Sequence, residues 1–177
     1  MALNYKNLDA RTRTLMLSEI ERDVAGGTLY LSDNLSPQGR SDFPDLLRES
    51  AEKGSDVTLA AAILRRLNSH KKPGRLKSGE YSKPPVMRSN AHEMLAEGEF
   101  NRYYIRALCL RATEDGNPTV VVYRAKAVEH ARSESERKIG VAVPVTELLR
   151  DLRSHPGVDT ALGLPAGPNS GLSVHLA

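Results

Sequence analysis

The clearest hydrophobic periodicity lies in the middle of the chain, between residues 90 and 124. Apolar and aromatic residues recur there at helical spacing, and the stripe comprises Phe100, Tyr103, Tyr104, Ala107, Leu108 and the stem of Arg111. Asn90 can cap the first turn, and Glu93 follows at the spacing of a capping box. Gly116-Asn117-Pro118 ends the pattern, and the β-branched run 119–125 is typical of a strand. The pattern predicts a long amphipathic helix that leads into a strand.

Three shorter helices are predicted before residue 70. Asp9 is placed to cap a helix that runs to about Ala25. A turn over residues 35–40 precedes a second helix over 41–53, and Asp56 then caps a third helix. Each of these helices carries an apolar stripe that is too large to stay exposed. We therefore expect them to pack on one another and on the central helix.

Short strands are predicted around the central strand. Residues 141–145 form one candidate, and Pro144 is placed to start a helix that continues to residue 153. The alternating run 172–176 can add an edge strand near the C-terminus. The predicted fold class is α+β, with the N-terminal helices and the central amphipathic helix packed on a small, mostly antiparallel sheet.

The pattern divides the chain into three parts of one compact domain. Residues 1–69 form an N-terminal helical part, and residues 89–177 hold the central helix, the sheet and a C-terminal tail rich in Gly and Pro. Between them, residues 70–88 contain several Pro and Gly residues and a single Leu, so this segment cannot form a long helix or bury much surface. The sequence predicts an extended, exposed arm, which we expect to be mobile until it meets a partner.

Charge is concentrated in and beside this arm. The chain carries a net charge of +3, but eight basic residues and one acid, Glu80, lie between residues 65 and 88, which gives that segment +7 and leaves −4 elsewhere. Such polarity suits a negatively charged partner, including an acidic patch on a second copy. The candidate partner- or phosphate-binding residues of the arm are Lys71, Lys72, Arg75, Lys77, Tyr81, Lys83 and Arg88. The alternative is a solvated linker without a partner.

A second candidate lies on the polar side of the central helix. Glu99, Arg102 and Arg106 follow one another at i, i+3 and i+7. Glu99 and Arg102 can form a local pair, whereas Arg102 and Arg106 repel each other unless an anion or a carboxylate lies between them. We therefore add Arg102 and Arg106 to the candidate binding residues, with solvation or pairing within the fold as the alternative.

Catalytic and metal-binding patterns are not found. His92-Glu93 lacks the second His that a zinc-protease helix requires, because position 96 is Ala. A metal-dependent nuclease often places a carboxylate two residues before a Lys on a strand. Position 124, two residues before Lys126, is Arg, so this metal ligand is missing. The single cysteine, Cys109, lies among apolar residues and is predicted to be an inert thiol. The sequence predicts no enzyme, no metal and no cofactor, and no apolar run reaches the roughly 18 residues of a membrane span.

Part of the chain resembles proteins encoded by tailed phages and prophages. The likeness rests on the runs Arg88-Ser89-Asn90-Ala91-His92-Glu93-Met94-Leu95, Glu99-Phe100-Asn101-Arg102-Tyr103-Tyr104-Ile105-Arg106-Ala107-Leu108-Cys109, Val122-Tyr123-Arg124-Ala125 and Gly167-Pro168-Asn169-Ser170-Gly171-Leu172. The resemblance names no family with established functional residues, so no residue roles follow from it.

The resemblance implies a virion component near the phage head, made in the host cytoplasm. Its expected partners are other virion subunits, either capsid or head proteins, in a homo- or hetero-oligomer bound through the arm and the C-terminal tail. The alternative from the residues themselves is a small nucleic-acid-binding protein, a regulator or an inhibitor of a host system, that uses the basic arm.

Overall fold

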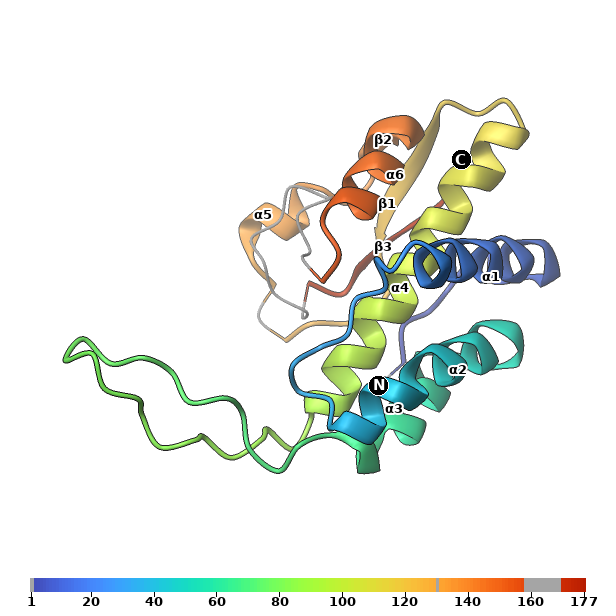
Figure 1. The fold of residues 1–177 in the computed structure, drawn as a ribbon. Helices are drawn as coiled ribbons and strands as arrows, with labels where there is room; N and C mark the ends of the chain where they lie inside the picture. Colours follow the sequence, from blue (N-terminus) through green and yellow to red (C-terminus); the bar gives the residue numbers. More distant parts are fainter. Residues whose placement is uncertain (1, 130, 158–169) are drawn as a thin grey trace.

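A long central helix organises the molecule. The computed structural model describes residues 2–129, 131–157 and 170–177. Helix α4 (Ala91–Glu114) runs through the middle, and the helices α1 (Ala10–Ala25) and α3 (Asp56–Ile63) pack on one side of it (Figure 1). Helix α2 (Pro37–Lys53) packs on α1 and α3. The sheet and helix α6 (Val145–Ser154) pack on the other side of α4. The α+β fold class, the packing of the N-terminal helices on one another and the packing of α1 and α3 against the central helix are confirmed.

The N-terminal helices begin at side-chain caps. Asp9 accepts a hydrogen bond from the backbone N–H of Thr12, as the sequence predicts for α1. Helix α2 begins earlier than predicted, because Ser36 caps it and Pro37 takes the first helical position. Proline suits that position, since its φ is already helical and its missing N–H has no helical partner to lose. The predicted turn over 35–40 is therefore wrong from residue 37 onward.

Two further caps differ from the sequence prediction. Ser55, and not Asp56, caps α3, and its side chain accepts a hydrogen bond from the N–H of Val57. Asn90 does stand at the N-cap of α4, but its side chain makes no capping hydrogen bond, so the predicted capping box with Glu93 does not form. Helix α3 continues into a short 3-10 helix, η1 (Leu64–Arg66).

Helix α4 is buried on more sides than an amphipathic pattern predicts. Phe100 and Leu108 have no exposed surface, in agreement with the predicted apolar face. The side that carries Glu99, Arg102 and Arg106 is buried as well, because α1 and α6 cover it. Of the two alternatives that the sequence leaves open for these charges, solvation is wrong, and the side chains lie in the interior.

In the described part of the chain, the sheet has three antiparallel strands in the order β2-β1-β3. Strand β1 (Thr119–Arg124) lies between β2 (Ala142–Pro144) and β3 (Leu172–Leu176). The short helix α5 (Ser133–Glu136) lies in the connection from β1 to β2, and Pro144 directly precedes α6. Because Leu172 and Val174 are buried in the sheet, this end of the C-terminal segment is not a free docking tail. The rest of the predicted tail, residues 158–169, lies outside the described residues.

The N-terminal segment, residues 3–7, packs against the sheet and against α4. The N–H of Asn4 donates to the carbonyl of Ala125, and the N–H of Leu176 donates to the side chain of Asn7. The Tyr5 ring lies against Phe100 and Tyr104 of α4, with ring centroids 5.2 and 4.7 Å away. Within the described ranges, no helix is long and apolar enough to cross a membrane.

Candidate partner-binding surface

The predicted arm is a projecting hairpin. Residues 70–86, called the hairpin below, run out from the body and return beside themselves (Figure 1). Antiparallel bridges join His70 with Val86 near the body and Arg75 with Tyr81 near the tip. Backbone hydrogen bonds support both bridges, among them Leu76 N–H to the Glu80 carbonyl at 2.7 Å and Lys71 N–H to the Pro85 carbonyl at 2.8 Å. The ladder is interrupted between them, where Pro residues lack the N–H donor.

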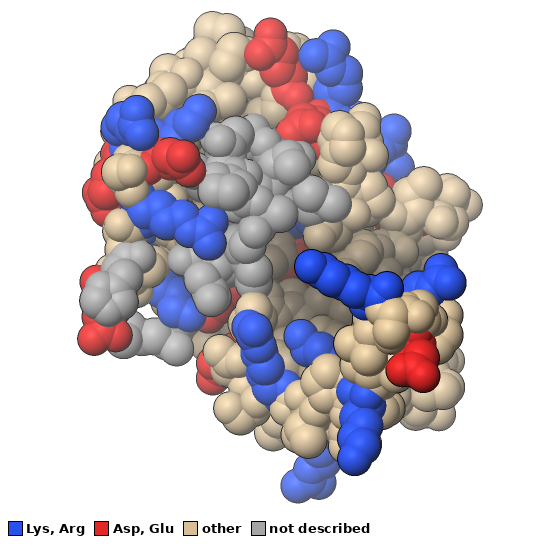
Figure 2. All heavy atoms as spheres, turned by 90° about the vertical axis from the view of Figure 1, so that its left-hand side faces the viewer, with Lys and Arg blue, Asp and Glu red and all other residues tan. Residues whose placement is uncertain are grey.

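The hairpin tip gathers cations around an aromatic ring. Tyr81 is 72% exposed and lies directly across from Arg75. Lys77 lies in the turn at the tip, and Lys83 follows Tyr81 by two residues on the returning half. All four side chains are exposed. We call Arg75, Lys77, Tyr81 and Lys83 the tip cluster, and Figure 2 shows Lys and Arg side chains gathered over this lower part of the molecule.

The base of the hairpin is attached to the body by weak contacts. The ammonium of Lys72 lies 2.9 Å from the Asp33 carboxylate, and both side chains are largely exposed. The hydrogen bond from Lys72 holds the pKa of Asp33 below its ordinary value. An exposed ion pair of this kind contributes at most about 1 kcal/mol. The body therefore fixes the direction of the hairpin only lightly.

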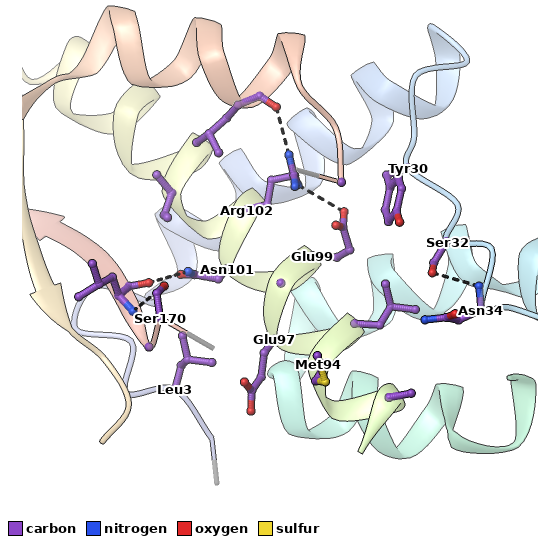
Figure 3. Close-up of a pocket in the computed structure, with 18 of the residues that line it drawn as sticks. Leu3, Tyr30, Ser32, Asn34, Met94, Glu97, Glu99, Asn101, Arg102 and Ser170 are labelled. Atoms are coloured by element: carbon purple, nitrogen blue, oxygen red, sulfur yellow. Dashed lines mark hydrogen bonds and ion pairs between the residues drawn. The ribbon is translucent and has the colours of Figure 1, made fainter. Parts of the chain in front are cut away.

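A groove of about 420 Å³ lies at the base of the hairpin. It crosses the first half of α4 at Gly98, between the loop 30–34 on one side and residues 170–172 on the other (Figure 3). Its lining includes Leu3, Met94, Leu95 and Gly98, with Lys71 and Arg88 from the two ends of the predicted arm. The groove and the hairpin are thus one continuous surface.

The charged groups in the floor of the groove pair with one another. Glu97 forms an ion pair with Lys126. The Glu99 carboxylate lies 3.5 Å from the guanidinium of Arg102, which also donates to the carbonyl of His155 at 2.9 Å. Burial raises the pKa of Glu99 above its ordinary value, against the opposing charge of Arg102. The floor of the groove is close to neutral, and the unbalanced positive charge lies at its rim and on the hairpin.

Arg106 belongs to an internal ion network. Its guanidinium contacts the carboxylates of Glu19 and Asp23 from α1, each at 2.5 Å, and only 1% of its side chain is exposed. The hydroxyl of Tyr103 donates to Asp23 at 2.8 Å, and Arg153 of α6 pairs with Glu19. Two carboxylates and two guanidinium groups therefore balance in the core. Arg106 has no surface to offer a partner, and the alternative of pairing within the fold is the correct one for this residue.

The sequence-predicted candidates therefore separate into two groups. Six residues of the set remain exposed on or beside the hairpin: Lys72, Arg75, Lys77, Tyr81, Lys83 and Arg88. Lys71 is half-buried at the groove, and Arg102 is buried in its floor. The sequence did not indicate Glu19 and Asp23 as partners of Arg106, although their spacing of four residues beside Met16 and Ile20 places them near the apolar stripe of α1.

Other chemistry is limited in the described part of the chain. Within residues 2–129, 131–157 and 170–177, no three His, Cys, Asp or Glu side chains lie close enough to hold a metal ion. Cys109 is fully buried, and this burial raises the pKa of its thiol to about 12. A thiol with so high a pKa is a poor nucleophile at neutral pH.

Comparison of the chain with family models, curated proteins and solved structures finds no match. The candidate surface consists of the cationic hairpin that projects from the body and the groove at its base.

Proposed function

We propose that the protein is a structural or assembly component of a tailed-phage virion, which binds neighbouring capsid or head-associated subunits through the hairpin. The observation that carries this proposal is the exposure of apolar side chains on the projecting hairpin. Leu76, Tyr81 and Val86 are 48%, 72% and 73% exposed. Exposed apolar groups on a projection are typical of surfaces that another protein covers.

The energetics of the hairpin support a docking role. An isolated two-stranded hairpin is only marginally stable in water, and this one has little apolar contact with the body. Docking on a neighbouring subunit would bury the apolar side chains and supply the missing contacts. The resemblance to phage-encoded proteins supports a virion as the place where such docking occurs.

A second candidate function is nucleic-acid binding, and the tip cluster is the observation that favours it. Arg75, Lys77 and Lys83 can neutralise phosphates near the tip of the hairpin, and the exposed Tyr81 ring can stack on a base. Three phosphate contacts predict a slope of roughly −2 to −3 in a plot of log affinity against log salt concentration. Electrophoretic mobility shifts at increasing salt measure this slope directly.

The experiment for the main proposal compares two chains in phage particles. One is the full chain, and the other replaces residues 73–84 by a short Gly-Ser linker. The gene for this protein is deleted from the phage genome, and the host expresses one of the two chains in its place. The amount of that chain is then measured in purified particles. We expect the full chain in the particles and little of the linker variant. A matched control, Lys53→Ser on α2, removes an exposed cation far from the hairpin and should leave incorporation unchanged. Particles that lack even the full chain would contradict the proposal.

A further inference from the structure

We infer that the groove at the base of the hairpin binds an extended acidic segment of a neighbouring protein subunit, with an apolar side chain seated over Gly98. This inference rests on the proposed function, because it takes the partner to be a protein. The groove would be a second contact site beside the hairpin, and the segment that occupies it would be acidic with one apolar anchor.

Gly98 makes close approach to helix α4 possible. Among the residues that the structure describes, no atom lies within 4 Å of a Cβ atom added at Gly98. Its neighbours Glu97 and Glu99 are both buried, and the exposed Gly98 backbone forms the floor of the groove between them. Glycine inside a helix is less favourable than alanine. Its presence here leaves room for a side chain from outside.

The walls beside Gly98 suit an apolar group. Leu3, Met94 and Leu95 line the groove, and the buried residues Ile105 and Leu152 belong to the same lining. The volume of about 420 Å³ lies within the range of pockets that hold small ligands or a few side chains. Since Glu97 and Glu99 each face a cation, an apolar group placed between these pairs leaves their charges compensated.

The rim determines the charge of the flanking residues. Lys71 and Arg88 lie at the mouth of the groove, and the hairpin beyond them carries further cations and the single acid Glu80. Carboxylates on either side of an apolar anchor therefore match the rim, and such complementarity steers association. A nucleic acid fits the groove less well, because the floor cations Lys126 and Arg102 are already paired with Glu97 and Glu99 and an apolar wall offers phosphates no compensating charge. Any nucleic acid would be confined to the tip cluster.

The test uses an array of synthetic peptides of about nine residues, which span roughly 30 Å when extended. Each peptide carries one central Leu, Met or Phe among Asp, Glu, Ser and Gly. Matched sets replace the apolar residue by Ala or the acids by Lys. We expect the full-length protein to retain acidic peptides with the apolar anchor and to release both matched sets. Affinities of the retained peptides are then measured by fluorescence anisotropy.

Three variants locate the binding. Gly98→Trp fills the groove, and Arg88→Glu reverses the charge of its rim without touching the core. Each should weaken peptide binding about tenfold or more, the loss typical of a central contact residue. Lys53→Ser should leave binding unchanged. If Gly98→Trp alters the circular dichroism spectrum, Arg88→Glu and Lys71→Glu still decide the question, since both residues lie at the rim.

Two results of the peptide experiment would overturn the inference. The first is an array without retained peptides, and the second is peptide binding that neither Gly98→Trp nor Arg88→Glu weakens. Incorporation into particles separates the inference from the proposed function. If the hairpin replacement prevents incorporation and both groove variants are incorporated normally, the groove inference fails and the proposed function stands. If the full chain is absent from particles, the proposed function fails whatever the peptides show.

Discussion

Arg106 of α4 and Asp23 of α1 form a bidentate ion pair inside the core. One guanidinium nitrogen lies 2.5 Å from Oδ2 of Asp23, and the other lies 3.0 Å from Oδ1. Glu19, one turn earlier on α1, contacts the same guanidinium. The pairing sets the relative position of α1 and α4, because a shift of either helix would leave buried charges without partners.

Removal of the Arg106 charge should strongly destabilise the protein. Arg106→Leu leaves Asp23 and Glu19 buried with one cation, Arg153, and we expect a loss of roughly 3–5 kcal/mol in the free energy of unfolding. Arg11→Ala removes an exposed pair with Glu114 and should cost less than about 1 kcal/mol. Urea unfolding measures both. Equal losses in the two variants would show that the internal network is not formed.

The same network predicts how stability depends on pH. Burial alone would raise the pKa of Asp23, but the hydrogen bonds and charge of Arg106 outweigh it, so its folded pKa lies below the ordinary value. A carboxylate with a lowered pKa stabilises the fold above its unfolded pKa, and this contribution is lost as pH falls through the folded pKa. The loss should therefore begin near pH 4, the ordinary range for Asp.

Asp23→Asn tests this pH dependence. The variant should be clearly less stable than wild type at pH 7. The difference should narrow as the pH falls below about 4, because Asp23 is protonated first in the unfolded chain and, at lower pH, in the folded wild type. Urea unfolding of both proteins at pH 7, 5, 4 and 3 gives the comparison. A difference that stays constant over this range would mean that Asp23 carries no paired charge in the folded protein.

Two side chains of the central helix report on the core. Phe100 and Leu108 have no exposed surface, so their replacement by Ala leaves cavities in close-packed surroundings. Each substitution should lower the free energy of unfolding by roughly 2–5 kcal/mol. Thermal melting followed by circular dichroism suffices as a measurement. Melting within a degree of wild type for both variants would show that this helix face does not form the core.

The positions of several helices and strands follow from local sequence patterns. The periodicity of residues 100–111 predicts the long helix, and the β-branched run after Pro118 predicts β1, because both signals act over a few residues. The role of Ser36 and Pro37 was missed because Pro, Gly and Ser also favour turns, and the sequence does not say which of the two they form. Local patterns thus locate the elements better than their ends.

The charged residues of α4 show where sequence reasoning stops. Glu99, Arg102 and Arg106 follow the pattern of a solvated side, and their burial depends on α1 and α6, which are distant in the sequence. The acidic partners of Arg106 lie more than 80 residues away along the chain. The sequence predicts an extended arm over residues 70–88, but not the pairing of its two halves or the groove at Gly98, which α4 forms with segments distant in the sequence.

The accessibility of the hairpin to protease is a further prediction. The hairpin is exposed and has few contacts with the body, so limited trypsin digestion of the free protein should cut first between Lys71 and Lys83. The flanking helices α3 and α4 should stay intact, and mass spectrometry of the fragments identifies the sites. Resistance throughout residues 71–83 would mean that the hairpin is fixed by the body and would contradict its role as a segment that gains order on docking.

Docking through the hairpin is tested most directly by removing the charges of the hairpin. The amount of this chain in purified phage particles is then measured. The variant replaces Lys71, Lys72, Arg75 and Lys77 by Ser, and circular dichroism melting confirms that the body remains folded. If the hairpin docks the protein on a neighbouring subunit, the variant should be incorporated far less than the wild type and the Lys53→Ser control. Equal incorporation of all three chains would contradict the account.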